Sequence, residues 1–358
     1  MLLRTLSALA AALLFIALLR LPPAILYSAG RQPATVTVTV IDAGARYPLA
    51  NADVIDLATN QHRFTDAHGQ ARLSWPTDAP LRLRVRQVGY QPLKRTLERA
   101  ALSEEATTFA LSKVAYVISP VTATGHCVTT DDSVSLGLSV SVLDQLKQGA
   151  EKYDEFRRLY PFEATLERRT ARVPETGPVT YIVRENETFQ SETWEQPYRP
   201  GNIVEYSSYA SFNAPLLSLS MLADSVFWDN HCFIARGIES YRGARAVRLE
   251  FSPVTDLGGP DWMGAALLDS ATSNLLRVEF HLANLDTRKG LRRLEGYQTF
   301  SSPSPFVIIP DSIAAVWWTR ETSSDDPDLG RPDFAQSLHI ESLKYRQAKP
   351  PENQRIKR

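Results

Sequence analysis

Alternation of apolar and polar residues dominates this chain, and it first occurs in Thr35–Ile41, whose sequence is TVTVTVI. A period of two is typical of a strand with one buried face. After residue 163 the same period returns in run after run, separated by turn sequences such as Pro174–Gly177 and Asp269–Asn274. Adjacent strands joined by short turns form antiparallel sheets. The sequence therefore predicts a mainly β protein.

The N-terminus has the features of an export signal. Arg4 precedes a mostly apolar run, Leu6–Leu19, and Ser28–Gly30 supplies the small residues of a cleavage site. This order is that of a secretory signal peptide, so we predict that residues 1–30 are removed on export. The alternative is an uncleaved anchor, although a run of about 14 apolar residues is shorter than the roughly 18–20 that a spanning helix needs. If the segment is retained, it is the one membrane contact that we predict.

The charge balance argues against nucleic-acid binding. Residues 1–30 hold Arg4 and Arg20 and no acidic residue, so the mature chain carries 37 basic and 40 acidic residues, a net charge of −3. A nucleic-acid-binding protein needs a basic field, and only the tail, residues 347–358, is locally basic. Prolines and few apolar residues predict that this tail is disordered. We therefore expect no nucleic-acid partner.

The first module, residues 33–113, contains few helix signals and many turn signals. Its motifs include Pro48–Val54, Thr65–Gln70 and Leu81–Arg86, the last followed by Val88-Gly89-Tyr90. This series resembles the carboxypeptidase regulatory-like domain, a small transthyretin-like β-sandwich of exported proteins. The resemblance implies a scaffold without chemistry of its own. Alternation predicts an inward face formed by Val36, Val38, Val40, Val54, Leu73, Leu83, Val85 and Tyr90.

Residues 114–163 are predicted to form a connector followed by a helix. From Ser139 to Tyr160 the apolar residues fall mostly at spacings of three, four or seven, which is typical of an amphipathic helix. Ser141 is the expected N-cap, and Pro161 ends the helix. Gly149 weakens its middle.

Residues 164–346 are predicted to form a larger curved antiparallel sheet, in a half-barrel, barrel or sandwich. The alternation is interrupted at two places, and each predicts a break between two short strands. One break separates Val179–Glu185 from Thr188–Thr193, and the other separates Phe306–Ile309 from Ile313–Glu321. Leu216–Phe227 is the exception to the strand pattern, and it predicts a short helix or ordered loop.

Two resemblances concern this second half. The order of Ala214–Leu217, Leu222–Phe227 and His231–Phe233 resembles the C-terminal half of exported Gram-negative proteins that carry a carboxypeptidase regulatory-like domain. The pattern from Gly237 to Phe280 is similar to lipoprotein-carrier half-barrels, whose concave face could shelter an acyl chain. These resemblances imply a location in the periplasm or outer envelope, or outside the cell, and no particular activity.

Cys127 and Cys232 are the only cysteines, and each follows a histidine. In an oxidising exported compartment, two such cysteines most simply form one disulfide. The alternatives are two unpaired structural cysteines, a zinc site that includes His126 and His231, and a catalytic thiol. A zinc site is disfavoured because adjacent strand residues point to opposite faces and the Cys-x-x-Cys spacing is absent. We therefore predict a Cys127–Cys232 bond.

The sequence holds no metallocarboxypeptidase, zincin or serine-hydrolase motif. No histidine has a glutamate three residues later, and neither His-Glu-x-x-His nor Gly-x-Ser-x-Gly occurs. No catalytic residue, cofactor site or metal site is therefore predicted. Asp224 and His231 are weak candidates for acid–base chemistry. The alternative is that Asp224 caps or braces a turn.

Trp317 and Trp318 are adjacent on a predicted strand, so one indole is expected in the core and the other on the surface. An exposed indole could stack on a sugar. A rim position or a partner contact explains such an indole equally well.

These patterns favour an exported, non-enzymatic envelope protein in which a β-sandwich adaptor is joined to a β-rich domain that binds a protein, glycan or lipid. Two alternatives stay open. One is a periplasmic carrier or sensor that holds an apolar or acyl ligand in the concave sheet, and the other is a hydrolase that uses Asp224 and His231. The carrier requires that the apolar side chains of Val247–Phe280 line an open trough. The hydrolase requires an acid and a base in one pocket.

Overall fold

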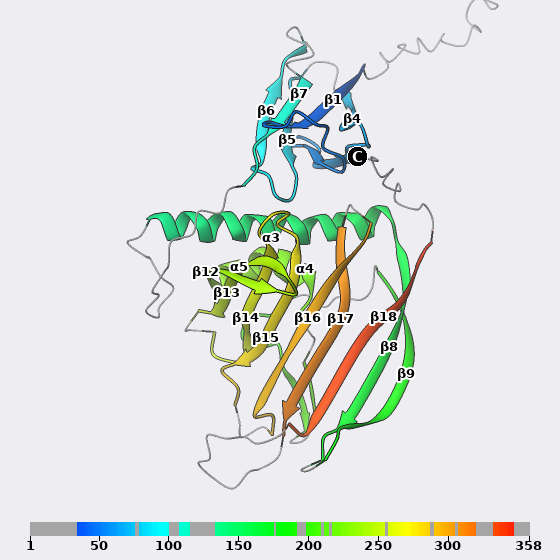
Figure 1. The fold of residues 1–358 in the computed structure, drawn as a ribbon, viewed down its shortest axis with the longest axis vertical. Coiled ribbons are helices and arrows are strands. Elements are labelled where there is room, and N and C mark those ends of the chain that lie inside the picture. Colours follow the sequence, from blue (N-terminus) through cyan, green and yellow to red (C-terminus); the bar gives the residue numbers. More distant parts are fainter. Residues whose placement is uncertain are drawn as a thin grey trace, which may run out of the picture.

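A computed structural model gives the fold of the chain (Figure 1). It describes residues 34–75, 79–99, 107–114, 133–174, 177–191, 198–208, 211–214, 217–254, 257–286, 290–304, 307–319 and 332–346. The predicted signal peptide (residues 1–30), the connector residue Cys127 and the basic tail (residues 347–358) lie outside these ranges. No helix in the described part of the chain is long and apolar enough to cross a membrane.

The first module is a β-sandwich of two small sheets. One sheet has the order β4–β1–β7, formed by Gln70–Trp75, Ala34–Asp42 and Thr108–Leu111. The other has the order β3–β2–β5–β6, formed by Gln61–Phe64, Asp53–Asp56, Leu81–Arg86 and Leu93–Leu97. The described strand pairs are antiparallel except β1 with β7, which is parallel. All eight predicted core residues are buried, in a cluster separate from that of the second domain.

A long helix, α3 (Ser133–Leu159), lies between the sandwich and the larger sheet (Figure 1). The predicted apolar stripe is buried at Val142, Leu146, Tyr153 and Phe156. The predicted start is wrong, because the helix begins eight residues before the expected N-cap, Ser141. In SVSLGLSV, which opens the helix, apolar residues alternate with small ones. Because a period of two is typical of a strand, the sequence pattern does not predict the first two turns of this helix.

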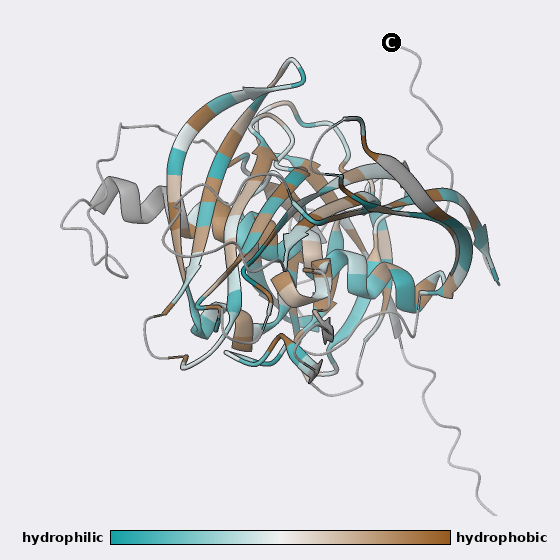
Figure 2. Ribbon diagram, turned by 90° about the horizontal axis from the view of Figure 1, so that it is seen from below, coloured by the Kyte–Doolittle hydropathy of each residue, from teal (hydrophilic) through white to brown (hydrophobic). Residues whose placement is uncertain are grey.

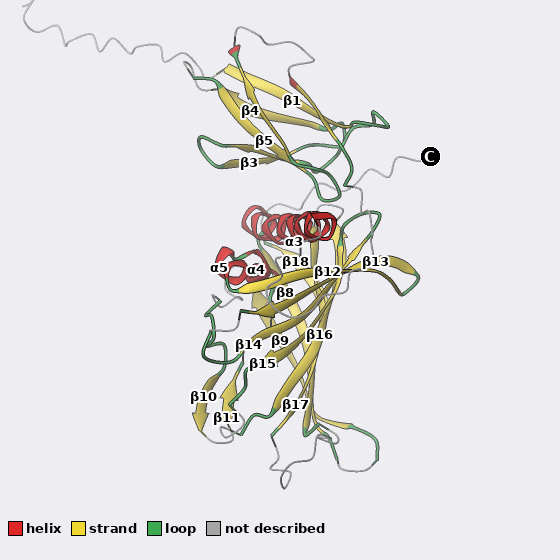
Figure 3. Cartoon of the chain, turned by 90° about the vertical axis from the view of Figure 1, so that its left-hand side faces the viewer, coloured by secondary structure: helices red, strands yellow, loops and turns green. Residues whose placement is uncertain are grey.

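The second half forms a nine-stranded antiparallel sheet with the order β12–β13–β14–β15–β16–β17–β18–β8–β9. These strands are β8 (Phe162–Arg172), β9 (Thr180–Gln190), β12 (His231–Tyr241), β13 (Ala244–Pro253), β14 (Asp261–Asp269), β15 (Leu275–Ala283), β16 (Arg293–Ser304), β17 (Val307–Trp318) and β18 (Phe334–Tyr345). The sheet is strongly curved but open, with β12 and β9 at its edges (Figure 3). The hairpin β10 (Glu205–Ser208) and β11 (Ser211–Asn213) stands apart from it. The predicted fold class, mainly β with a curved sheet, is confirmed.

Alternate residues of the sheet strands form its core. Hydrophobic and hydrophilic bands alternate along the ribbons (Figure 2), and residues that pair across strands point to the same side. One set of side chains packs in a single cluster with the stripe of α3. On this face Phe280 lies between Gly264 and Gly296 on the neighbouring strands. A Cβ on Gly296 would lie 2.9 Å from the Phe280 ring, so glycine makes room for the ring.

The two predicted strand breaks do not occur. Pro310 lies inside β17, opposite Phe300, where the register with β16 shifts. A register shift tolerates proline because the missing N–H interrupts no regular ladder. β9 continues through Glu185–Glu187 as an edge strand paired with β8. Its residues from Val183 to Asn186 are exposed, so the strand requires no apolar alternation there.

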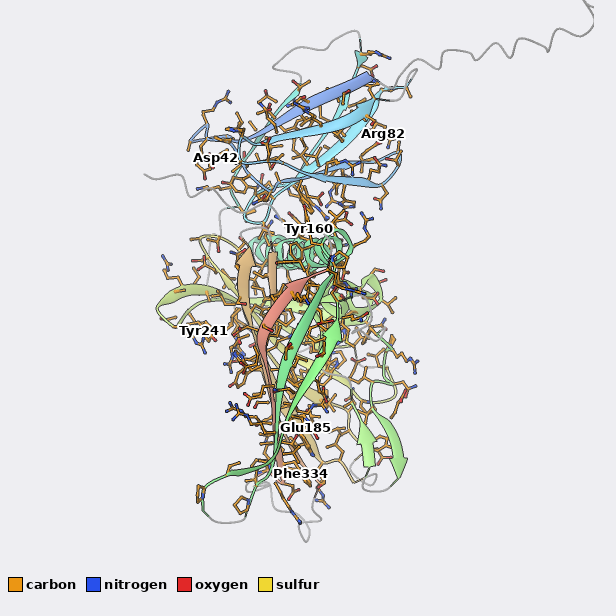
Figure 4. All side chains as sticks on the ribbon, turned by 90° about the vertical axis from the view of Figure 1, so that its right-hand side faces the viewer. Asp42, Arg82, Tyr160, Glu185, Tyr241 and Phe334 are labelled. Atoms are coloured by element: carbon orange, nitrogen blue, oxygen red, sulfur yellow. The ribbon has the colours of Figure 1, made fainter. Side chains whose placement is uncertain are left out.

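The sandwich touches α3 and one turn of the sheet domain. The Gln145 side chain of α3 accepts a hydrogen bond from the Gly89 N–H (2.6 Å) and donates one to the Tyr90 carbonyl (3.3 Å). Gly89 has a φ of 88°, and a Cβ there would lie 3.1 Å from the Thr272 carbonyl oxygen. This loop therefore fits closely between α3 and the β14–β15 turn. In Figure 4, Tyr160 marks the end of the helix layer beneath the sandwich.

A buried charge cluster adjoins this contact. Asp53 accepts hydrogen bonds from the Arg86 Nε (2.9 Å) and lies 3.0 Å from the His62 ring. Arg86 also pairs with Glu151 of α3. The Arg86 and Asp53 side chains are only 4% and 3% exposed. The cluster thus connects the sandwich to the helix with little access to water.

Lys152 of α3 completes the junction and gives it a pH dependence. It donates to the Asn51 carbonyl (2.8 Å) and the Gln87 side chain (3.2 Å). Burial lowers the pKa of Lys152 from 10.5 to about 8, although Asp53 opposes this shift. Between those pH values the unfolded chain binds a proton that the folded chain has lost. The free energy of unfolding therefore rises with pH in this window, by up to about 1.4 kcal/mol per unit.

We expect urea unfolding between pH 8 and 10 to show this rise in the native protein and a smaller one in Lys152→Met. Lys147→Met is the matched control, because the Lys147 amine lies over the Trp228 ring on the same helix, 3.9 Å from its centroid. A slope that is equal in the native protein and Lys152→Met would contradict the lowered pKa.

Candidate functional site

Asp224 braces two short helices. Its N–H donates to the Met221 carbonyl at the end of α4 (Leu219–Ala223). Its carboxylate accepts a hydrogen bond from the Val226 N–H (2.8 Å) at the start of α5 (Ser225–Asp229). This carboxylate therefore acts as a helix cap, which is the structural alternative considered from the sequence.

His231 lies in the core at the start of β12, with its side chain fully buried. Its Nδ1 lies 2.7 Å from the Phe227 carbonyl oxygen, its Nε2 lies 2.8 Å from that of Trp262, and its ring stacks on Phe227. Burial lowers the pKa of His231, while the two carbonyls and Asp261 oppose this shift. Both ring nitrogens are occupied within the core. No described contact joins His231 to Asp224, so these residues do not form an acid–base pair.

Neither indole of Trp317–Trp318 is exposed. Trp318 is 7% exposed, and the Arg293 guanidinium lies 5.0 Å from the centre of its ring. Trp317 is half-buried and stacks on Phe334, with 5.6 Å between ring centres. Trp317 packs against the core cluster and Trp318 does not, as expected for adjacent strand residues, but the Arg293 side chain of the neighbouring strand covers the Trp318 ring, so the expected exposure is absent.

Cys232 lies on β12 opposite Ser252 of β13. There is no free thiol among the described residues. Because Cys127 lies outside those residues, its bond with Cys232 remains a prediction.

Most of the apolar side chains of Val247–Phe280 point toward the helices, whereas Met263 and Ala265 lie on the opposite face. The side chains that point toward the helices belong to the same cluster as the α3 stripe, and the following are each 2% exposed or less: Val247, Leu249, Phe251, Trp262, Ala266, Leu268, Val278 and Phe280. The face that an acyl carrier needs to be open is therefore filled by protein along these strands.

A hollow lies on the opposite face of β12 to β17. It has a volume of about 1120 Å³ and opens to solvent. We call it the trough, and most of its side chains come from the positions that alternate with the core residues, although Phe251 and Phe280 of the core also line it. The lining includes Cys232, Ile234, Arg236, Arg248, Glu250, Met263, Ala265, Arg277, Glu279, His281, Glu295, Tyr297, Ala314 and Val316. In Figure 4 the β12–β13 hairpin, marked by Tyr241, projects from the sheet.

Ion pairs cross one end of the trough, and we call this set the Arg–Glu row. The pairs are Arg236–Glu250 at 2.6 Å, Arg248–Glu250 at 3.4 Å, Arg248–Glu279 at 3.2 Å and Arg277–Glu279 at 3.0 Å. The Arg248–Glu279 pair joins β13 to β15 across β14. Ala265 pairs with both Glu250 and Glu279 in the sheet, and its small side chain leaves space for the ion pair to cross.

The charge states of the trough follow from these neighbours. Burial alone would lower the pKa of Arg248, but Glu279 and the other glutamates raise it overall, so the guanidinium stays charged. The Arg277 guanidinium lies 3.9 Å from the centre of the Tyr297 ring, a cation–π contact. Burial and the charge of Arg293 lower the pKa of His281, which is therefore mainly neutral at pH 7.

The other end of the trough is of mixed character. Met263 is 38% exposed there, and Cys232 and Val316 line the same region. His281 and Glu295 lie between Met263 and Val316 in the same row across the strands. The trough can therefore offer both charged and apolar contacts to one molecule.

Within the described residues, no three side chains of the types His, Cys, Asp and Glu lie close enough together to hold a metal ion. The trough offers charged and apolar contacts, and its acidic residues are engaged with arginines.

No protein-family model and no curated protein matches this chain. One similar solved structure is a domain named as an outer membrane lipoprotein-sorting protein from Vibrio parahaemolyticus, with 13% identity, a TM-score of 0.28, and coverage of 57% of this chain and 95% of that chain. Another is a DUF1329 family protein from Desulfovibrio piger, with 12% identity, a TM-score of 0.33, and coverage of 58% and 95%. Similarity this low decides nothing about ligand or activity.

The trough residues were missed at the level of sequence. Arg248 and Glu250 alternate with Val247, Leu249 and Phe251, and the same alternation recurs in β15. This regular alternation of charged with apolar residues along β13 and β15 indicates that the face of the sheet opposite the core is charged.

Proposed function

We propose that this chain is an exported, non-enzymatic binding protein that holds an amphiphilic ligand in the trough. It acts in the periplasm or at the outer envelope of a Gram-negative bacterium, where the signal-like N-terminus directs it. The sandwich serves as an adaptor for an envelope component, as its resemblance to carboxypeptidase regulatory-like domains implies.

The observation that carries this proposal is the mixed lining of the trough, in which ion-paired side chains lie beside exposed apolar ones. The Arg–Glu row offers charged donors and acceptors to a polar head. Met263 and Val316 offer apolar surface to a chain, although His281 and Glu295 lie between them on the neighbouring strands. The volume of about 1120 Å³ exceeds the roughly 300–1,000 Å³ of ordinary small-molecule sites. A lipid-sized amphiphile suits this space better than a small metabolite.

A non-enzymatic role agrees with the environments of the candidate catalytic residues. Asp224 serves as a helix cap, and His231 has both nitrogens against core carbonyls. Neither side chain lines the trough.

The proposal predicts that a carboxylate in place of the Met263 side chain weakens ligand binding. Lysophosphatidylcholine, below its micelle concentration, is the probe, and calorimetric titration is the measurement. We expect saturable binding to the native protein and an affinity at least about ten-fold lower in Met263→Asp, because the acyl chain must then lie against a charge. Met263 is 38% exposed, so the substitution should preserve the fold.

Val226→Asp is the matched control. Val226 is 43% exposed on α5, outside the trough, so this variant should bind like the native protein. Arg248→Met tests the polar end and should also weaken binding. The proposal is wrong if the native protein binds no lysophospholipid, or if Met263→Asp and Val226→Asp bind it equally well.

A further inference from the structure

A second hollow lies between the sandwich and the sheet domain, and we call it the interdomain cleft. Its volume is about 460 Å³. One wall is the sandwich, with Tyr47, the Gln87–Tyr90 loop and Lys113; another is α3; the third is the β14–β15 turn. It shares no lining residue with the trough.

The charges of this cleft are all of one sign. Two lysines line it, Lys113 and Lys152, and no aspartate or glutamate does so in the described part of the chain. The trough differs, because its three arginines face three glutamates. Asp42 lies behind the cleft, 3.9 Å from the Lys113 amine, and already accepts hydrogen bonds from the Gly44 and Ala45 N–H groups and the Tyr90 hydroxyl.

Buried donors supply the floor of the cleft. Lys152 is buried, and its amine donates two described hydrogen bonds of the three that an ammonium can make. Gln145 is 1% exposed and donates one described hydrogen bond of the two that its amide can make. Both residues line the cleft, so one ammonium and one amide belong to its floor. A buried ammonium is held there by neutral oxygens of Asn51 and Gln87 rather than by a direct carboxylate partner.

The third wall has a rigid geometry and hydroxyl side chains. Asp269 holds the β14–β15 turn by accepting hydrogen bonds from the Ala271 N–H (2.9 Å) and the Thr272 N–H (2.7 Å). The turn presents Thr272, Ser273 and Asn274 to the cleft. Hydroxyl and amide side chains suit a ligand that itself carries several hydroxyl groups.

We propose that the interdomain cleft binds a small hydroxylated carboxylate of the size and chemistry of a sugar acid. The carboxylate lies between Lys113 and Lys152, and the ligand hydroxyls meet the amide of Gln145 and the β14–β15 turn. Tyr47, which is 43% exposed, supplies an aromatic edge to the site. This site is separate from the trough and does not depend on the function proposed for it.

The test is calorimetric titration of the full chain with glucuronate, with glucose as the neutral counterpart and inorganic phosphate as the counterpart without a sugar ring. We expect saturable glucuronate binding and at least ten-fold weaker binding of glucose and of phosphate. Lys152→Met should weaken glucuronate binding at least about ten-fold, because a charge-assisted contact is lost. Lys113→Met should weaken it as well. Lys113 is exposed, so that variant should fold even if Lys152→Met does not.

Lys147→Met is the control, because Lys147 lies on the same helix but outside the cleft. It should bind glucuronate like the native protein, as should Met263→Asp in the trough. The inference is overturned if the native protein shows no saturable glucuronate binding, if glucose or phosphate binds as well as glucuronate, or if Lys113→Met binds it with native affinity.

Discussion

Replacement of Asp53 by alanine is expected to lower the free energy of unfolding by about 3–5 kcal/mol. Asp53 is the carboxylate at the centre of the buried cluster, with Arg86 and His62 as direct partners and Lys152 nearby. Without it, Glu151 is the one carboxylate that the described contacts leave to Arg86. Uncompensated buried charge is among the most costly defects in a folded protein. Urea unfolding at pH 7 measures the change.

The same residue predicts a defined acid sensitivity. Burial alone would raise the pKa of Asp53. His62 and Arg86 lower it by more than burial raises it, so the pKa in the folded protein lies below the ordinary 3.8. The stability that Asp53 contributes is therefore complete above that value and is lost as the pH falls through the lower folded pKa. Asp53→Asn should remove this part of the acid dependence. Asp66→Ala, at an exposed turn, is the control, and a similar loss in both variants would contradict the proposed cluster.

The second large effect concerns the predicted Cys127–Cys232 bond. A bond that closes a loop of about 100 residues stabilises a fold by up to about 4–5 kcal/mol in the entropic description. We expect a reductant to lower the free energy of unfolding of the native protein by an amount of this order. Cys232→Ser should have this lower stability from the start and should not respond to the reductant.

Thiol titration provides the independent measurement. The unfolded, non-reduced native protein should contain no reactive thiol, and Cys232→Ser should contain one. Two reactive thiols in the native protein would show that the cysteines are unpaired, and the alternative of two structural cysteines would then hold. The exported compartment makes the bonded form the expected one.

Much of the fold could be predicted because it depends on local periodicity. The sandwich core, from Val36 to Tyr90, follows from strict alternation within single strands. Errors arose where local pattern and tertiary context differ. The first turns of α3 have a strand-like period, and Pro310 is tolerated in β17 because the register with β16 shifts beside it.

The candidate site was harder to predict because it depends on which strands become neighbours. Residue type selected Asp224 and His231, and both proved to serve the packing of α4, α5 and β12. The Arg248–Glu279 pair joins residues 31 apart across an intervening strand. No local pattern specifies that contact, since it requires the order β13–β14–β15 and the small side chain of Ala265 between them.

The placement of core and trough residues on opposite faces of β13 and β15, from which only Phe251 and Phe280 depart among the described residues, has a consequence for how such a protein can evolve. The residues that build the folding core and the residues that face the trough occupy alternate positions of the same strands. After gene duplication, substitutions at the trough positions can therefore change ligand preference without a change in the packing of the core. For an engineer, a library restricted to the trough positions of these two strands, Arg248, Glu250, Arg277 and Glu279, samples new specificities on a scaffold whose interior stays constant.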